Sequence, residues 1–286
     1  MRAIEELFSA AGCQGWLCVR DVDGGGDAAV ALRAGEPVAS ASVFKVTVGL
    51  EVALRIEAGD LDPAARVRLV AGETTAGPTG FSRFEHDAEA SVADLLRAMM
   101  AISDNAATDA LLDLVGVDAV NATTRALGLV GTMLPGPLRD LVARVSETGT
   151  GTEAYADAHA LSPEGGPRTT AADMAELLCL IWRDEAGPPA ACARLREAMA
   201  GQFTRHRLRA AFPREVGVVA KSGTLAGILR NEVGVITRPD GRRFAAAVFT
   251  RAAVPGRGDR EIDAAIGAAA AAAVARLVGA SGAGRP

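Results

Sequence analysis

The chemistry in this sequence begins with a serine and a lysine three residues apart, in the run Ser42-Val43-Phe44-Lys45. The spacing of apolar residues predicts an amphipathic helix over residues 42–56. Positions i and i+3 of a helix share one face, so the Lys45 amine can reach the Ser42 hydroxyl. A neutral lysine can take the serine proton, and a helix N-terminus favours the negative charge that develops. An isolated pair of this kind is more often a capping serine beside a surface lysine.

A second motif, Ser103-Asp104-Asn105, falls between two stretches with helical spacing, residues 92–102 and 106–115. The hydroxyl of Ser103 would relay a proton to a leaving group, and Asn105 would orient Lys45 or the substrate. Serine and aspartate are also common helix N-caps, so the alternative is a purely structural cap.

The third motif, Lys221-Ser222-Gly223-Thr224, ends a β-rich run. A strand edge binds an extended ligand through its backbone, and Gly223 permits close approach, so we expect Ser222, Gly223 and Thr224 to contact substrate. Lys221 would place a positive charge near Lys45, and a nearby like charge lowers the pKa of a lysine. The alternative is an ordinary edge strand that carries a lysine.

The choice of basic residues supports a chemical role for both lysines. Of the 30 basic residues, 28 are arginines, and only Lys45 and Lys221 are lysines. Arginine keeps its proton in proteins, whereas a buried lysine can lose it. The three motifs together therefore indicate a serine acyl-transfer enzyme with Ser42 as nucleophile. The backbone N–H groups of Ser42 and Thr224 would form its oxyanion hole.

The same three motifs, in this order, are the signature of class A β-lactamases and penicillin-binding proteins. From residue 17 to about 277 the sequence resembles a class A β-lactamase-related serine hydrolase, and Arg168-Thr169-Thr170 resembles the end of the Ω loop of that family. The resemblance implies catalytic roles for Ser42, Lys45, Ser103 and Lys221. It also implies that Arg230, nine residues after Lys221, binds the substrate carboxylate, as the equivalent residue does in some members.

One departure from the family concerns release of the acyl group. The Ω loop of the family carries Glu-x-x-Leu-Asn, whose glutamate activates the deacylating water, and this sequence lacks that string. Glu153, with Asp157, lies at roughly the right distance before Thr169 and is the candidate base. Rival acids, all of which have a solvated loop position as the alternative, are Asp140, Glu147 and Glu164. We therefore expect acylation at Ser42 with slow release of β-lactams. The alternatives are a covalent acyl-binding protein with little turnover and a cytosolic esterase.

The positions of helices and strands predict how these motifs are held. Strands are expected over residues 15–21, 28–32, 216–221, 231–237 and 244–251. Helices are expected over residues 2–11, in the middle of the chain between the second and third strands, and over 259–278. Residues 135–167 read as a long irregular loop. The predicted fold class is α+β of the α/β sandwich type. An antiparallel sheet from both termini is covered by terminal helices, and an all-helical domain is inserted, as in β-lactamases and transpeptidases. We expect residues 1–38 and 186–286 to form the sheet domain and residues 39–185 the helical domain, together one catalytic unit.

Composition narrows the partners to a small-molecule acyl substrate. The net charge is −5, and the densest basic spot, residues 205–209, reads as a solvated helix end, so nucleic acid is not an expected partner. None of the four cysteines forms a CxxC pair, so we expect free buried thiols and neither metal nor cofactor.

No uncharged apolar stretch reaches 18 residues, so no membrane span is predicted. Glu5 and Glu6 fall where a signal peptide needs an apolar core, which predicts a cytoplasmic protein. The sequence predicts no oligomeric state.

Overall fold

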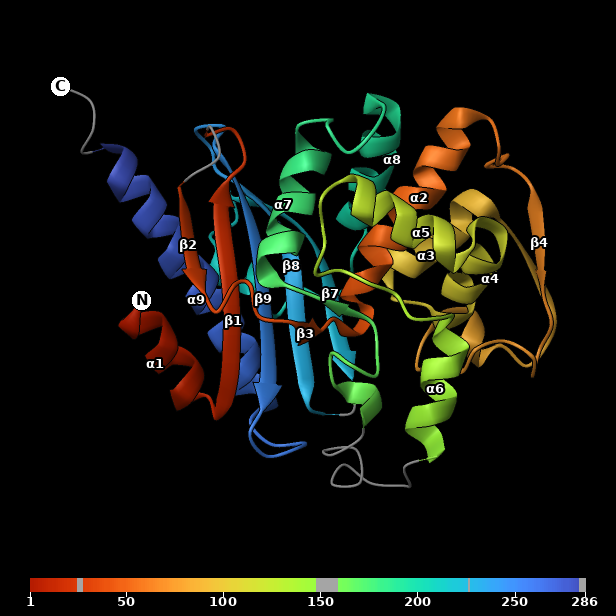
Figure 1. The fold of residues 1–286 in the computed structure, drawn as a ribbon, viewed down its shortest axis with the longest axis horizontal. Coiled ribbons are helices and arrows are strands. Elements are labelled where there is room, and N and C mark those ends of the chain that lie inside the picture. Colours follow the sequence, from red (N-terminus) through yellow and green to blue (C-terminus); the bar gives the residue numbers. More distant parts are fainter. Residues whose placement is uncertain (25–27, 148–158, 226, 283–286) are drawn as a thin grey trace.

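A five-stranded antiparallel sheet forms the centre of the computed structural model, which describes residues 1–24, 28–147, 159–225 and 227–282. The strand order is β2-β1-β9-β8-β7, so strands from both ends of the chain pair with one another (Figure 1). Their bounds are β1 Cys13–Asp21, β2 Ala29–Leu32, β7 Gly217–Leu225, β8 Leu229–Thr237 and β9 Arg243–Ala252. The predicted fold class is confirmed, and β7 lies at the edge of the sheet that faces the helical part.

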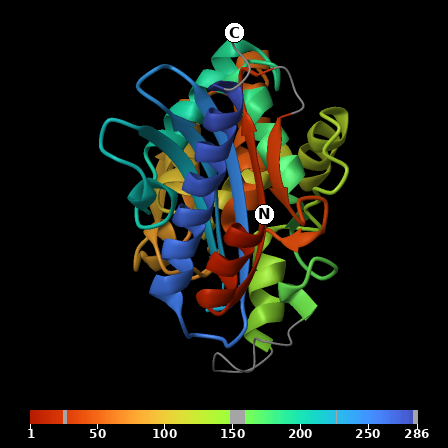
Figure 2. The same cartoon turned by 90° about the vertical axis from the view of Figure 1, so that its left-hand side faces the viewer.

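One face of the sheet is covered by the two terminal helices, α1 (Arg2–Ala10) and α9 (Asp259–Gly282). Figure 2 shows them side by side in front of the strands. Apolar residues of α9 such as Ile262 and Ile266 are fully buried in one cluster with Phe8 of α1 and Leu17 of β1. By length and composition α9 would be able to cross a bilayer, but here its apolar side packs on the sheet.

The opposite face of the sheet packs against α7 (Ala171–Trp182) and the helical part of the molecule. Its central element is α2 (Lys45–Ala58), which contacts α3 (Val92–Ala101), α4 (Asn105–Val115), α5 (Val117–Ala126) and α8 (Pro189–Ala200). Every residue from 45 to 53 is buried, so the expectation of an amphipathic helix is wrong. A helix that is enclosed by other helices is buried on all sides. The polar side chains that it carries then need specific hydrogen-bond partners.

The predicted loop over residues 135–167 is also partly wrong. It contains α6 (Leu138–Glu147) and a short 3-10 helix, η3 (His159–Leu161). The apolar residues of α6 recur at helical spacing, but the Gly-, Pro- and Thr-rich residues around it hide the pattern. Glu153 and Asp157 lie outside the described residues.

Two small sheets join segments distant in sequence. β3 (Val38–Ala39) pairs with β6 (Arg168–Thr169), and β4 (Arg66–Leu69) pairs with β5 (Ala88–Ser91); these short strands were not predicted. Three further 3-10 helices are η1 (Ala41–Phe44), η2 (Gly80–Arg83) and η4 (Leu208–Ala211).

The predicted domain boundary at residue 185 falls between α7, which packs on β1 and β9, and α8, which packs on α2 and α3. The division into two domains stays a prediction.

Candidate active site

Ser42 lies in η1, immediately before α2, where strand β7 passes very close to the backbone. A Cβ atom added to Gly223 of β7 would lie 2.9 Å from the Ser40 carbonyl oxygen and 3.1 Å from the Ser42 amide nitrogen. Only a residue without a side chain fits between the strand and Ser42 at this distance. In the structure it is the chain's own segment around Ser42 that approaches Gly223, and the predicted contact of this glycine with substrate stays a prediction.

Asn231 of β8 holds the segment that leads into Ser42. Its Nδ2 atom donates to the carbonyl oxygens of Ala39 and Ser40, both at 3.1 Å, and its Oδ1 atom accepts from the Thr250 amide at 3.0 Å. The side chain is 1% exposed, so these bonds are shielded from water. The sequence predicts only a strand position for Asn231, because the segment that it holds lies about 190 residues earlier in the chain.

The two lysines meet at the hydroxyl of Ser103. Lys45 Nζ lies 3.2 Å from Ser103 Oγ, and Lys221 Nζ lies 3.1 Å from the same atom. Lys45 Nζ also donates to the Ser103 carbonyl oxygen at 2.7 Å and to Asn105 Oδ1 at 2.9 Å. A neutral amine has two N–H groups for these two oxygens, which leaves its lone pair for a hydroxyl proton.

Burial perturbs the pKa of both lysines, since each is 0% exposed. Burial, together with the positive charge of Lys221, holds the pKa of Lys45 well below its usual 10.5. The pKa of Lys221 is lowered to about 7, chiefly by burial; the charge of Glu232 opposes this shift and that of Arg207 adds to it. Lys45 is thus suited to act as a base at a pH well below 10.5.

The loop that carries Ser103 is shaped by its neighbours. Ser103 has φ +59°, a left-handed conformation that is unusual for a residue other than glycine. Asp104 is buried and caps α4 by accepting from the Ala106 and Ala107 amides, and it also accepts from the Phe81 amide at 2.7 Å. The capping alternative therefore holds for Asp104, while Ser103 and Asn105 face the lysines.

These residues open onto a cavity of about 450 Å³. Ser42, Ser103 and Asn105 line it on one side, and Ser222 and Thr224 of β7 line it on another. The rest of its wall is largely apolar, from Ala41, Phe44, Ala76, Gly77, Pro78, Thr79, Ile102, Leu138, Leu141, Val142, Val145, Ser146, Thr204 and Leu225. The structure thus brings together every residue predicted from the three motifs.

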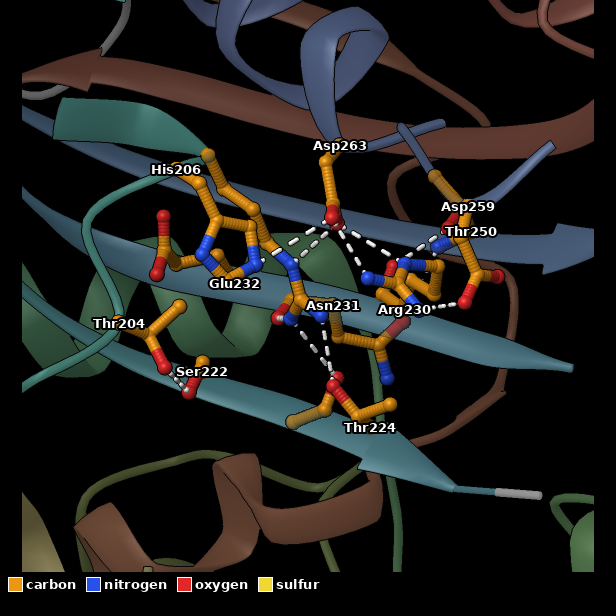
Figure 3. A network of polar contacts seen from close by, with 12 residues as sticks. Thr204, His206, Ser222, Thr224, Arg230, Asn231, Glu232, Thr250, Asp259 and Asp263 are labelled. Atoms are coloured by element: carbon orange, nitrogen blue, oxygen red, sulfur yellow. Dashed lines mark hydrogen bonds and ion pairs between the residues drawn. The ribbon is translucent and has the colours of Figure 1, made fainter. Parts of the chain in front are cut away.

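Arg230 does not join them. Its guanidinium makes a two-bonded ion pair with Asp263 of α9, at 2.9 and 2.6 Å, and a third bond to Asp259 at 2.8 Å (Figure 3). It does not line the cavity. The prediction that Arg230 binds the substrate carboxylate is therefore wrong, because its donors are engaged in the ion pairs that join β8 to α9.

Arg207 is the arginine that contacts the cavity wall. It donates to Thr224 Oγ1 at 2.6 Å, to the Gly223 carbonyl oxygen at 3.2 Å and to Asp263 at 2.6 Å. It is 2% exposed, so the reading of residues 205–209 as a solvated helix end is wrong for this residue. Its burial depends on Asp263, 56 residues further along the chain, and no local signal in the sequence reveals it.

Of the acids proposed for deacylation, the two whose side chains the structure describes, Asp140 and Glu164, do not line the cavity. Within the described parts of the chain, no aspartate or glutamate lines it. Asp140 and Glu164 are both exposed to solvent. Glu153 and the side chain of Glu147 lie outside the described part of the chain.

Comparison with known proteins agrees with this arrangement. The model of the β-lactamase enzyme family matches residues 1–277. The chain is 32% identical over 284 residues to the β-lactamase regulatory protein BlaB of Streptomyces cacaoi, a match that covers 89% of this chain and 90% of that protein. The chain belongs to the β-lactamase enzyme family. Membership explains why the three motifs converge, as the resemblance implied.

Solved β-lactamases share the fold of this family member. The β-lactamase of Sphaerobacter thermophilus superposes with a TM-score of 0.79 at 23% identity, covering 100% of this chain and 98% of that one. The β-lactamase of Xanthomonas campestris superposes with a TM-score of 0.79 at 25% identity, covering 97% of each chain. The class A β-lactamase fold is thus the fold of this chain.

Proposed function

We propose that this protein is a serine acyl hydrolase in which Ser42 forms an acyl-enzyme with a β-lactam or a related ester or amide. The observation that carries the proposal is the meeting of two fully buried lysines at the Ser103 hydroxyl, in the cavity that Ser42 lines. Burying two amines side by side opposes stability unless their partners compensate, so the arrangement is typical of a catalytic site.

The proposed acylation proceeds in three proton transfers. Ser42 Oγ attacks the carbonyl carbon while its proton passes to neutral Lys45, and the amides of Ser42 and Thr224 hold the oxyanion. When the tetrahedral intermediate collapses, the bond from the carbonyl carbon to nitrogen or oxygen breaks. The leaving atom takes a proton from Ser103, which regains one from Lys45, the amine protonated in the first transfer. Ser42 is then esterified, and water must release the acyl group.

A covalent acyl-binding protein with little turnover is the second candidate. The observation that favours it is the apolar cavity wall, on which the described residues place no carboxylate to activate water. A positioned general base contributes a factor of about 10²–10⁴. The relative named a β-lactamase regulatory protein is compatible with such a role. Glu153 remains the proposed base for a hydrolase.

A time course of intact mass separates the two candidates. The protein is incubated with benzylpenicillin and, separately, with p-nitrophenyl acetate. A hydrolase gives a transient adduct and continuing product release, whereas a covalent binder gives a stoichiometric adduct that persists. Turnover of penicillin that collapses in Glu153→Gln, with acylation retained, would identify the base. The absence of any adduct and any turnover with both compounds would overturn both candidates.

A further inference from the structure

The helix α6 forms an apolar wall of the Ser42 cavity. Leu138, Leu141, Val142 and Val145 line the cavity and follow helical spacing i, i+3, i+4, i+7. Between them in sequence lie the exposed charged residues Arg139, Asp140 and Arg144, and Ala143 is also exposed. One face of α6 is therefore directed into the cavity and the other toward solvent.

A buried aspartate fixes the direction of this wall. Asp109 of α4 is 2% exposed and accepts from the amides of Leu138 and Arg139, both at 2.7 Å. It also accepts a short hydrogen bond from Thr75. Asp109 thus satisfies the first amides of α6, which anchors the helix where its stripe meets the cavity.

Strand β7 gives the cavity two distinct ends. Lys221, Gly223 and Leu225 share one face of the strand, and residues two apart are separated by roughly 7 Å. Gly223 lies against Ser42, and Lys221 lies on the Ser103 hydroxyl. Leu225 therefore lies on the far side of Ser42 from Ser103.

Leu225 and the end of α6 belong to the same apolar surroundings. Leu225 and Val145 both pack against the small cluster of Ala39, Ala41, Leu161, Ile228 and Leu229. If Ser103 protonates the leaving group, the leaving group lies at its end of the cavity. The acyl group must then extend the other way, toward Leu225 and α6.

We infer that α6 and Leu225 form an acyl-binding site for apolar, uncharged acyl groups, so that the substrates are esters or amides of apolar carboxylic acids. This inference rests on the proposed function, because it uses Ser103 as the proton donor. Among the described residues that line the cavity none is charged, so a charged acyl group would be buried without a partner. An apolar group gains from every methylene that it buries.

The test is a series of p-nitrophenyl esters with one leaving group: acetate, butyrate and hexanoate. Burial of each methylene corresponds to a factor of about four in kcat/KM, so acylation should rise steadily with chain length. The monosuccinate ester, similar in length to these esters but carrying a carboxylate, should react roughly 100-fold more slowly than the butyrate.

Two variants of α6 locate the effect. Val142→Asp should lower the ratio of hexanoate to acetate rates about tenfold or more, whereas Ala143→Asp, the same charge on the exposed face, should leave it unchanged. Should Val142→Asp fail to fold, Val142→Phe should shift the preferred chain from hexanoate to a shorter ester by filling the cavity. A flat chain-length profile with Ser42 still acylated by acetate would overturn the acyl-binding site alone. No acylation by any ester would overturn the proposed function instead.

Discussion

Replacing Gly223 by alanine would place a methyl group between β7 and the segment that carries Ser42. The new Cβ would lie 2.9 Å from the Ser40 carbonyl oxygen, 3.1 Å from the Ser42 nitrogen and 3.2 Å from Ala41 Cβ, against 3.4–4 Å for ordinary contact. Two of these atoms belong to the backbone, so the strand and the η1 segment must separate by roughly 0.5 Å.

That separation acts on catalysis more than on folding. The proposed oxyanion hole needs the Ser42 and Thr224 amides within about 2.7–3.1 Å of one oxygen, and loss of one donor costs a factor of roughly 10²–10³. Overpacking of this kind costs about 1–3 kcal/mol of stability. We therefore expect Gly223→Ala to fold and to acylate about 100-fold more slowly.

The assay is the second-order rate constant for acylation by p-nitrophenyl acetate, measured beside the melting temperature. Gly217→Ala is the matched control, because it lies in the same strand and its Cβ would meet only Thr237, at an ordinary 3.5 Å. It should acylate like the parent protein. If Gly223→Ala acylates within a factor of about three of the parent, the close approach does not serve an oxyanion hole.

Three further predictions concern the charged and thiol groups. Acylation needs neutral Lys45, so its rate should fall as pH drops through the pKa of this amine and should level off well below pH 10.5. A rate that still rises at pH 10.5 would contradict a lowered pKa. Lys45→Arg should slow acylation by a factor of about 10²–10⁴, because arginine keeps its proton. Asp263→Ala removes the shared counter-ion of Arg207 and Arg230 and should lower the free energy of unfolding by about 3–5 kcal/mol in a urea titration, where a loss below 1 kcal/mol would disprove the ion-pair account. The four cysteines are buried and free, and burial raises the pKa of Cys18 to about 11, so a disulfide reagent at pH 8 should label none in the native protein and four after unfolding; rapid native labelling would contradict their burial.

The candidate site was predictable in part because each of its motifs is local. Ser42 and Lys45 are three residues apart and Asn105 begins α4, so spacing indicates which side chains of one motif lie together. The meeting of the three motifs was implied by the resemblance to the family. The sheet was predictable for a similar reason, since its strands are apolar runs separated by turn residues.

The parts that escaped prediction depend on partners far away in the chain. Buried Arg207 is paired with Asp263, and Arg230 binds the same carboxylate and does not line the cavity. Neither fact has a signature within a few residues of either arginine. The helix α6 was not predicted, because glycine- and threonine-rich neighbours mask its helical pattern. The residue that binds its first turn, Asp109, lies 29 residues earlier in the chain.

The most direct test of the account is to locate the acyl group by peptide mapping after a brief reaction with p-nitrophenyl acetate and with benzylpenicillin. We predict that the acyl mass lies on the peptide that contains Ser42, that Ser42→Ala abolishes it, and that Ser103→Ala lowers its rate of formation without moving it. Undiminished labelling of Ser42→Ala, or an adduct on any other residue, would contradict the assignment of Ser42 as the nucleophile.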